Sequence, residues 1–253
     1  MQEVLLKPRM QFRISVEAEN ISPDKFANKT AGEIESIGIR MGNYKTTVGE
    51  LFSVKVNGSG IPEDTKIEME GDFSRVKRIG EKMTAGTILI KGDVDMHVGS
   101  GMSGGKITVS GNADSWAGKE MKGGELVIEG NASYYLGAGY RGESCGMRGG
   151  KITVMGNALD FLGEHMCGGE IVVKGNAGIL PGLSNNGGKI VIEGNTSRPG
   201  SEMTKGMIIV NGTVEEMMPV FKPEGSEVVD GISYRKYTGD VILNGKGILY
   251  VKE

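Results

Sequence analysis

The hydrophobic pattern of this chain repeats at a nearly constant interval across its middle. In each copy two aliphatic residues alternate with other residues, and a glycine closes the run, as in Ile107 and Val109 before Gly111. Alternation with a period of two predicts a short strand with one buried face. A strand of four or five residues cannot bury that face alone. The pattern therefore predicts a stack of strands that share one aliphatic stripe.

The closing glycines set the length of the repeat. They are separated by 21, 19, 19, 26, 19, 19 and 18 residues, so the usual period is 19, and the copy between Gly130 and Gly156 carries seven extra residues (26 minus 19). A fixed period of this size is typical of stacked repeat proteins. The closing glycines are Gly71, Gly92, Gly111, Gly130, Gly156, Gly175, Gly194 and Gly212.

Other columns of the repeat indicate how each coil turns. A second glycine stands six residues before the closing glycine in seven copies. In six of these copies a methionine stands nine residues before the closing glycine. For these methionines we favour filling of the core over an interface stripe. Asn or Asp usually follows the closing glycine, which favours a turn with a possible side-chain ladder. Five residues after that glycine a second, largely aromatic stripe contains His97, Trp116, Tyr135, Phe161 and Leu180.

Together these columns predict an all-β fold, a right-handed parallel β-helix of about eight coils with a 19-residue repeat. We favour the right-handed form because the six-residue sub-period of left-handed helices is absent from the sequence. The nine-residue glycine and aspartate repeats of calcium-binding β-rolls are absent as well. Eight coils at the usual strand spacing imply a rod of roughly 35 Å.

The repeat fails at both ends, where small mixed α/β caps are expected to cover the open sheet. The sequence thus divides into an N-terminal cap segment, 1–62, a parallel β-helix, 63–212, and a C-terminal cap segment, 213–253. Ser22-Pro23 and the Thr30 to Glu33 capping box predict short helices between residues 22 and 37. Strands are expected at 39–41 and 51–56 around a turn at 42–43, and at 234–237, 240–243 and 248–251.

Composition narrows the class of protein. Glycine makes up 43 of 253 residues, and because the excess is periodic it indicates turns rather than disorder. A net charge of −3 argues against nucleic acid as a partner. We expect a cytoplasmic protein, since neither a signal peptide nor a long apolar run is present. Cys145 and Cys167 lack metal-ligand spacing, and their small number suits a reducing compartment, although a disulfide is possible in principle.

Few side chains suggest catalysis or metal binding. His97 lies in the aromatic stripe, where packing or a solvent edge explains it, and His165 lies in a turn. Asp160, Glu164 and His165 are close in sequence but lack metal-ligand spacing. Residues 137–142 match the letters of a dinucleotide-binding motif without the strand-to-helix turn that the motif needs. We therefore assign no catalytic, no cofactor-binding and no metal-ligating residue.

The segment 133–147, which includes the seven extra residues, is the most distinctive part of the repeat. It carries Tyr134, Tyr135, Tyr140 and Arg141, and tyrosine and arginine are enriched at protein interfaces. An interface and a flexible surface loop are equal alternatives on the sequence alone.

The unit Gly-Gly-Lys-Ile-Thr-Val-x-Gly-Asn-Ala, together with residues 111–118 and 121–124, resembles the C subunit of formylmethanofuran dehydrogenase. That family is similar in turn to the Gly-x-Gly-x-Gly domain at the C-terminus of the glutamate synthase large subunit. The resemblance covers residues 63–212. Residues 22–27 and 77–86 also fit the C subunits, and the N-terminal cap and the overall length favour the formylmethanofuran dehydrogenase family over a glutamate synthase fragment.

The resemblance implies a non-catalytic scaffold in an oxidoreductase complex that reduces CO2 and forms formylmethanofuran, the first step of methanogenesis. It implies three kinds of partner: a formate-dehydrogenase-like subunit with tungsten- or molybdenum-pterin, a metal-dependent amidohydrolase-like subunit, and ferredoxin-like subunits with iron–sulfur clusters. The C subunits of that family hold none of these cofactors. The two cysteines of this chain agree, because an iron–sulfur cluster needs about four. Neither nucleic acid nor membrane is expected as a partner.

Two other functions stay open. One is a glutamate-synthase-like β-helix domain that couples an amidotransferase to a synthase site, which neighbouring genes would reveal. The other is a β-helix enzyme that acts on polysaccharide. That enzyme would need an exposed carboxylate cluster in a groove and usually secretion, whereas the acidic residues here are scattered over the repeats.

Overall fold

Strands dominate the structure, a computed structural model that describes residues 1–140 and 142–253. Within this described part, helices are short and confined to the N-terminal segment, so the expectation of a predominantly β fold is confirmed. In chain order the elements are β1 (Gln2–Pro8), β2 (Val16–Glu17), α1 (Pro23–Phe26), α2 (Ala31–Glu35), β3 (Gly38–Met41), β4 (Tyr44–Thr47), α3 (Val48–Leu51), β5 (Phe52–Asn57), the 3-10 turn η1 (Pro62–Asp64), β6 (Thr65–Glu70), β7 (Val76–Lys77), β8 (Thr87–Lys91), β9 (Lys106–Val109), β10 (Glu125–Ile128), β11 (Arg148–Val154), β12 (Cys167–Val173), β13 (Asn186–Ile192), β14 (Lys205–Val210), β15 (Lys222–Val229), β16 (Ile232–Gly239) and β17 (Gly247–Lys252).

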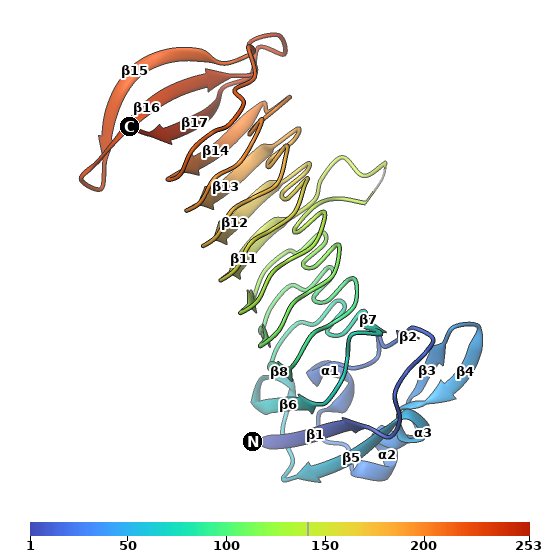
Figure 1. Ribbon diagram of the computed structural model, residues 1–253. Coiled ribbons are helices and arrows are strands. Elements are labelled where there is room, and N and C mark those ends of the chain that lie inside the picture. The colour runs from blue at the N-terminus through green and yellow to red at the C-terminus, as the bar shows by residue number, and fades with distance from the viewer. Residues whose placement is uncertain (141) are drawn as a thin grey trace.

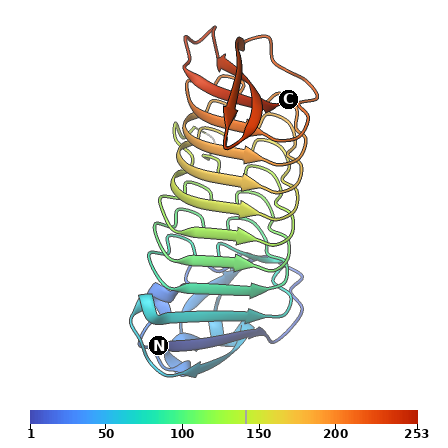
Figure 2. The same ribbon diagram turned by 90° about the vertical axis from the view of Figure 1, so that its left-hand side faces the viewer.

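One 13-stranded sheet runs the length of the molecule, in the order β15-β16-β17-β14-β13-β12-β11-β10-β9-β8-β6-β1-β5. From β8 to β14 the neighbours follow chain order and pair in parallel, one strand from each copy of the repeat. The strands stack along an elongated column (Figure 1). A view turned by 90° shows the broad face of this sheet (Figure 2).

The strand pairing keeps each column of the sequence in line. Ile107 pairs with Leu126, and Leu126 pairs with Ile152 across the seven-residue insertion. All three side chains are fully buried, so the aliphatic columns form the core as the alternation predicts. The insertion therefore leaves the register of the sheet unchanged.

A second line of parallel pairing follows the turn after each strand. Isolated bridges join Val94 to Ala113, Ala113 to Ala132, Ala132 to Ala158, and Ala158 to Ala177. Each repeat thus returns to the same two places on the column, and small side chains at these bridges keep the neighbouring coils close.

Glycine is required where one coil passes over the next. Gly150 has φ +84, and a Cβ built there would lie 2.7 Å from both the carbonyl carbon of Gly123 and the carbonyl oxygen of Gly124. Contacts of this length do not occur for real Cβ atoms, so any side chain would force the coils apart. The glycine columns are explained by contact between backbones as well as by the turn.

The methionine column fills the core beneath these glycines. Its six members are fully buried, which confirms the expectation of core filling over an interface stripe. The Met121 methyl group lies 2.8 Å from the position that a Cβ of Gly150 would take, so methionine occupies the space that the glycine leaves. The six are Met83, Met102, Met121, Met147, Met166 and Met203.

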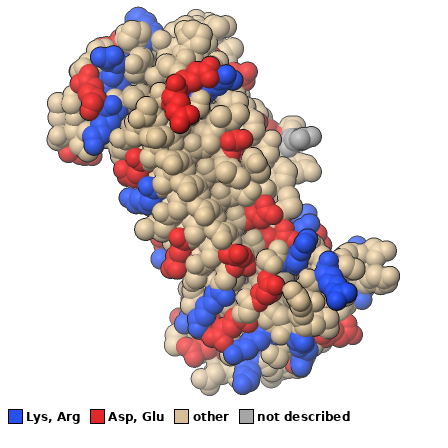
Figure 3. Space-filling view, in the orientation of Figure 1, with Lys and Arg blue, Asp and Glu red and all other residues tan. Residues whose placement is uncertain are grey.

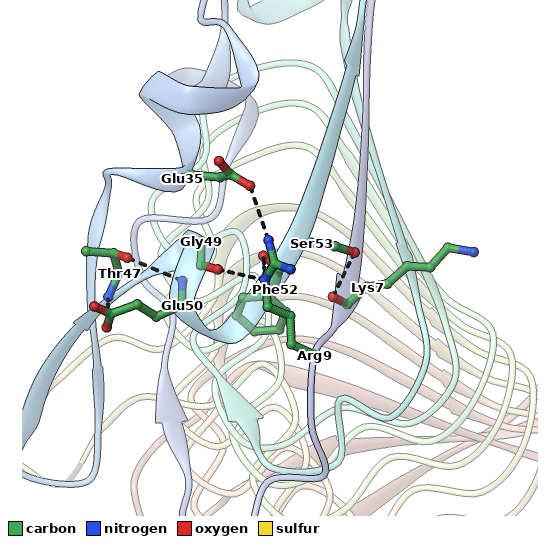
Figure 4. A network of polar contacts seen from close by, with 8 residues as sticks. All are labelled: Lys7, Arg9, Glu35, Thr47, Gly49, Glu50, Phe52 and Ser53. Carbon is green, nitrogen blue, oxygen red and sulfur yellow. Dashed lines mark hydrogen bonds and ion pairs between the residues drawn. The ribbon is translucent and has the colours of Figure 1, made fainter.

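The N-terminal segment extends the sheet at one end of the column. Strand β1 pairs in parallel with β6 and antiparallel with β5. Arg9 ties the helices to this edge: its Nε donates to the carbonyls of Gly49 (2.8 Å) and Phe52 (3.1 Å), and its terminal nitrogen pairs with Glu35 at 3.3 Å (Figure 4). The network joins α2 and α3 to the start of β5.

The predicted helices between residues 22 and 37 are confirmed as α1 and α2, and Thr30 and Glu33 form the expected capping box. The strands expected at 39–41 and 51–56 are confirmed as β3 and β5, but the turn at 42–43 does not join them. The turn at 42–43 joins β3 to β4, and α3 separates β4 from β5. The sequence signal was a second capping box, Thr47 with Glu50, which also appears in Figure 4.

At the other end, β17 pairs in parallel with β14, and β16 and β15 follow in antiparallel order. The expected strands at 234–237 and 248–251 are confirmed within β16 and β17, but 240–243 is a turn, in which an Asp240 carboxylate oxygen accepts from the Ile242 N–H at 2.8 Å. Strand β15 was missed because Pro223 appeared to break the pattern. At the sheet edge a proline needs no ladder partner for its nitrogen.

The division into cap segments 1–62 and 213–253 around a body at 63–212 stays a prediction.

Among the described residues, no helix is both long enough and apolar enough to cross a membrane.

Replacing Gly150 by valine is expected to destabilise the protein by about 3 kcal/mol or more, because valine meets both a left-handed φ and the backbone of the preceding coil. Lys151→Ala is the matched control. It removes a half-exposed ion pair with Glu170 at 3.0 Å, which is worth less than about 1 kcal/mol. Urea unfolding of both variants measures the difference, and equal midpoints would contradict the glycine assignment.

Candidate functional site

The aromatic stripe forms a stack on the outside of the column. The rings of His97, Trp116, Tyr135 and Phe161 lie nearly parallel, with centroids 5.5, 5.0 and 5.1 Å apart. Each of these side chains is half-buried, and Leu180 continues the line on the next coil. We call these five residues the aromatic ladder. His97 combines the two expectations, since its ring is half-buried at the surface, stacks on Trp116, and has a buried Nδ1 with no hydrogen-bond partner among the described residues.

The backbone turns the ladder side chains outward. All five residues have φ between +57° and +68°, a conformation that costs a non-glycine residue about 1 kcal/mol or more. Hydrogen bonds between coils hold them in line, since Trp116 N–H donates to the Tyr134 carbonyl at 2.9 Å and Phe161 N–H to the Ile179 carbonyl at 3.0 Å. Each stacked ring pair stabilises the folded state by about 0.5–1.5 kcal/mol, which offsets the free-energy cost of the left-handed backbone.

The insertion folds back onto the ladder. The Tyr140 ring lies 6.0 Å from the Trp116 ring, the Lys119 ammonium sits 5.0 Å from the Tyr140 centroid, and Tyr140 N–H donates to a Glu120 carboxylate oxygen at 3.3 Å. Half of the Tyr140 surface stays exposed. Arg141, the other interface candidate of this segment, lies outside the described residues.

The base of the insertion is fixed to the following coil. Gly139 N–H donates to the Glu164 carbonyl at 3.2 Å, and Gly146 N–H donates to the His165 carbonyl at 2.7 Å. Cys145 and Cys167 are joined in a disulfide, the possibility that the sequence left open. These ties hold the insertion beside the ladder.

A ladder of asparagine side chains runs along the turn after each strand. In each step the side-chain oxygen of one residue accepts from the backbone N–H of the next copy at 2.7–2.9 Å. The ladder confirms the stacking expected for this column and crosses the insertion from Asn131 to Asn157. Its acceptors are Asp93, Asn112, Asn131, Asn157, Asn176 and Asn195.

A shallow groove of about 510 Å³ lies between the asparagine ladder and the aromatic ladder. Ser133 and Leu159 line it, and Tyr135 and Phe161 follow two residues later in the aromatic ladder. The full lining is Ser74, Asp93, Val94, Asn112, Ala113, Asp114, Asn131, Ala132, Ser133, Asn157 and Leu159. The lining contains carboxylates, amides and apolar groups and has no basic residue.

The two carboxylates of the groove are held by hydrogen bonds rather than by cations. One Asp93 oxygen accepts from the Asn112 N–H at 2.7 Å, and one Asp114 oxygen accepts from the Ser115 N–H at 2.6 Å. Neither carboxylate forms an ion pair with a described residue. The groove therefore carries uncompensated negative charge.

The broad face of the sheet differs because its charges pair with one another. Glu170 pairs with Lys151 at 3.0 Å and Lys189 at 3.4 Å, and hydrogen bonds from these lysines lower its pKa. Lys106–Glu125 and Lys174–Glu193 repeat the arrangement on other coils. In the view of Figure 3, Lys and Arg gather at the two ends and along the left edge of the column, and the middle of the drawn face is mostly uncharged.

The other candidate residues do not assemble into a catalytic or metal site. One Asp160 carboxylate oxygen accepts from the Ile179 N–H at 3.0 Å, which is a turn contact, and His165 N–H donates to the Leu183 carbonyl. No group of three His, Cys, Asp or Glu in the described part of the chain could hold a metal ion. The assignment of no catalytic, cofactor-binding or metal-ligating residue stays a prediction.

Sequence reasoning named Tyr134 as an interface candidate but missed two further exposed apolar residues beside the ladder, Leu159 and Ile179. Tyr134, Leu159 and Ile179 are 45%, 42% and 41% exposed on successive coils. They lie one or two residues before ladder positions, where other copies carry polar residues such as Asp114 and Ser115. They stand in two adjacent columns of mixed residue types, which give no periodic signal in the sequence.

No protein-family model matches the chain. The C subunit of the tungsten-containing formylmethanofuran dehydrogenase 2 of Methanococcus maripaludis is 55% identical over 226 residues, which are 89% of this chain and 82% of that protein. Its counterpart from Methanothermobacter wolfeii is 46% identical over 98 residues, 39% of this chain, and that match spans only 36% of the relative's length.

A solved structure resembles the chain along nearly its whole length. It is the X-ray crystal structure of the formyltransferase/hydrolase complex (FhcABCD) from Methylorubrum extorquens in complex with methylofuran. One of its chains aligns with a TM-score of 0.90 and 27% identity, over 98% of this chain and 99% of that chain.

The pKa of His97 is expected to lie below its usual value of 6.5, because burial disfavours the charged ring and Arg78 and Lys119 repel it. Since the folded pKa is the lower one, the neutral ring adds stability above pH 6.5 that is lost as pH falls through the folded pKa. An NMR titration of the His165→Gln variant, which keeps only this histidine, measures the value. A pKa at or above 6.5 would contradict the burial of this ring in the ladder.

Proposed function

Because this chain belongs to the family of formylmethanofuran dehydrogenase C subunits, we propose that it is a scaffold subunit of a formylmethanofuran dehydrogenase complex. Such a complex is an oxidoreductase that reduces CO2 and forms formylmethanofuran. In this proposal the chain has no active site of its own. The observation that carries the proposal is 55% identity to a member of that family over 89% of the chain.

We also propose that the column is a right-handed parallel β-helix capped by the segments 1–62 and 213–253. Two parallel ladders with one step per repeat support the helical path. The right-handed sense is supported by the near-universal hand of connections between parallel strands of one sheet. Antiparallel pairing of β1 with β5, and of β15 and β16 beside β17, supports the capping role of both ends.

The absence of an active site from this chain is supported by what its polar groups already do. The asparagines bind the backbone of the next coil, His97 stacks on Trp116, and Asp160 accepts from a turn N–H. A catalytic group needs a free reactive atom and a partner that activates it. These candidates are instead used to hold neighbouring coils together.

The cofactors and the chemistry would then belong to other subunits. We propose as partners a metal-pterin subunit similar to formate dehydrogenases, an amidohydrolase-like subunit and ferredoxin-like iron–sulfur subunits, assembled in the cytoplasm. A solenoid suits a scaffold, because contacts between neighbouring coils along its whole length resist bending and keep bound subunits at fixed distances. The relation to glutamate synthase is kept as the alternative hypothesis.

The test is affinity purification of the tagged chain from its native host at endogenous expression. We expect the metal-pterin and amidohydrolase-like subunits to co-purify in stable proportion, and formylmethanofuran dehydrogenase activity to elute with them. The isolated chain should catalyse neither CO2 reduction nor transfer of a formyl group to methanofuran.

Two results would overturn the proposal. If the chain elutes alone, it does not belong to such a complex. If it elutes with a glutamine amidotransferase and a flavin-binding subunit, the coupling-domain hypothesis takes its place. A strain that expresses the tag alone controls for non-specific capture.

A further inference from the structure

One side of the column exposes a large apolar side chain on each of three successive coils. Tyr134, Leu159 and Ile179 are 41–45% exposed beside the half-buried rings of the aromatic ladder, and Tyr140 is 50% exposed at its edge. Single exposed hydrophobic residues are ordinary, but several on neighbouring coils of one side, next to half-buried rings, are typical of a surface that another molecule covers. We call this set, with the aromatic ladder and the adjoining groove, the ladder face.

The composition of the ladder face matches the centre of a protein interface. Stacked Trp116, Tyr135 and Phe161 present large, rigid surfaces, and aromatic residues are enriched among the side chains that contribute most to binding. Their rotamers are already fixed by stacking, so binding would cost little further conformational entropy. The left-handed backbone of the ladder residues has the same consequence, because it fixes the direction of the rings before a partner binds.

The charges of this face lack partners of opposite sign. Asp93 and Asp114 line the groove without an ion pair to a described residue. Two cations on this side are already engaged, since Arg78 pairs with Glu17 and Glu81, and Lys119 lies near Glu120 at 3.5 Å. The face thus offers negative charge beside apolar surface.

The sheet face lacks this combination. Its Lys and Glu side chains pair with one another on successive coils, as in Lys151–Glu170–Lys189. Charges that are compensated within one chain gain little from a partner, and the long stems of these side chains shield the aliphatic row between them. This arrangement suits a surface in contact with water.

We propose that the ladder face is the surface on which this chain binds another subunit of its complex. The inference rests on the proposed function and extends it by assigning a face. The occupant is a different polypeptide, one that places apolar side chains against the ladder and Arg or Lys side chains over the groove carboxylates. A second copy in a two-fold pair would bring the same acidic groove to both sides of the contact, which is unfavourable.

The experiment compares tagged variants in the native host. The double variant Leu159→Glu/Ile179→Glu adds charge at two exposed apolar positions, and Asp114→Lys reverses a groove charge. The matched control is Val241→Glu/Ile242→Glu, which changes two apolar residues that are 46% and 75% exposed at the far C-terminal turn. The readout is the amount of partner subunits recovered per amount of tagged chain.

We expect at least a tenfold loss of partner subunits for both ladder-face variants and less than a twofold change for the control. The isolated variants should melt within about 2 °C of the wild-type chain, because the substituted side chains are exposed. Oxidative footprinting of the wild-type complex adds a readout that needs no variant. Trp116, Tyr134 and Tyr135 should be protected relative to the isolated chain.

Three results would overturn the inference, and they are distinguishable. If wild-type chain recovers partners and the ladder-face variants recover them equally, another surface binds. If the isolated wild-type chain forms dimers that the double variant abolishes, a second copy is the occupant. If wild-type chain recovers no partner at all, the proposed function fails and this inference falls with it.

Discussion

The close passage of one coil over the next is the constraint on which the structure depends. At Gly150 the backbone of the preceding coil leaves no room for a Cβ, and seven of the eight copies of the repeat have a glycine at this position. That contact sets the distance between coils to the spacing of hydrogen-bonded strands. The methionine column, the aliphatic columns and the asparagine ladder all depend on it, because each packs or bonds to its own counterpart one coil away.

The same constraint explains why the insertion is tolerated. Strand pairing from Leu126 to Ile152 and the side-chain bond from Asn131 to Asn157 keep the normal register across seven additional residues. The additional residues leave the column at a turn and return to the next coil through backbone bonds near His165. From β8 to β13 each strand pairs only with the strands of the neighbouring copies, so a local bulge costs little elsewhere. The chain thereby gains an outward feature, with Tyr140 against Trp116, without loss of its core.

The repeat could be predicted from sequence because its columns are periodic, and periodicity reports shared structural roles. The direction of the aromatic stripe could not, since it depends on a left-handed φ at residues such as Trp116 that have a Cβ. The end segments carry single signals rather than repeated ones. Thr47 capped an unexpected helix, and Pro223 lay in an edge strand where its missing N–H does no harm. Leu159 and Ile179 were missed because their columns mix residue types.

The two long faces of the column differ in how many of their charged groups form ion pairs within the chain and in how much apolar surface they expose. The sheet face pairs its own charges, whereas the ladder face leaves Asp114 without a cation and Tyr134 exposed. The proposed scaffold role needs one surface that stays in water and another that binds. The most direct measurement is a cryo-electron microscopy structure of the complex purified from the native host. The account predicts another subunit packed over Trp116, Tyr135 and Phe161, with the Lys and Glu rows of the sheet in solvent. A complex in which the sheet face is covered and the ladder face is open would contradict it.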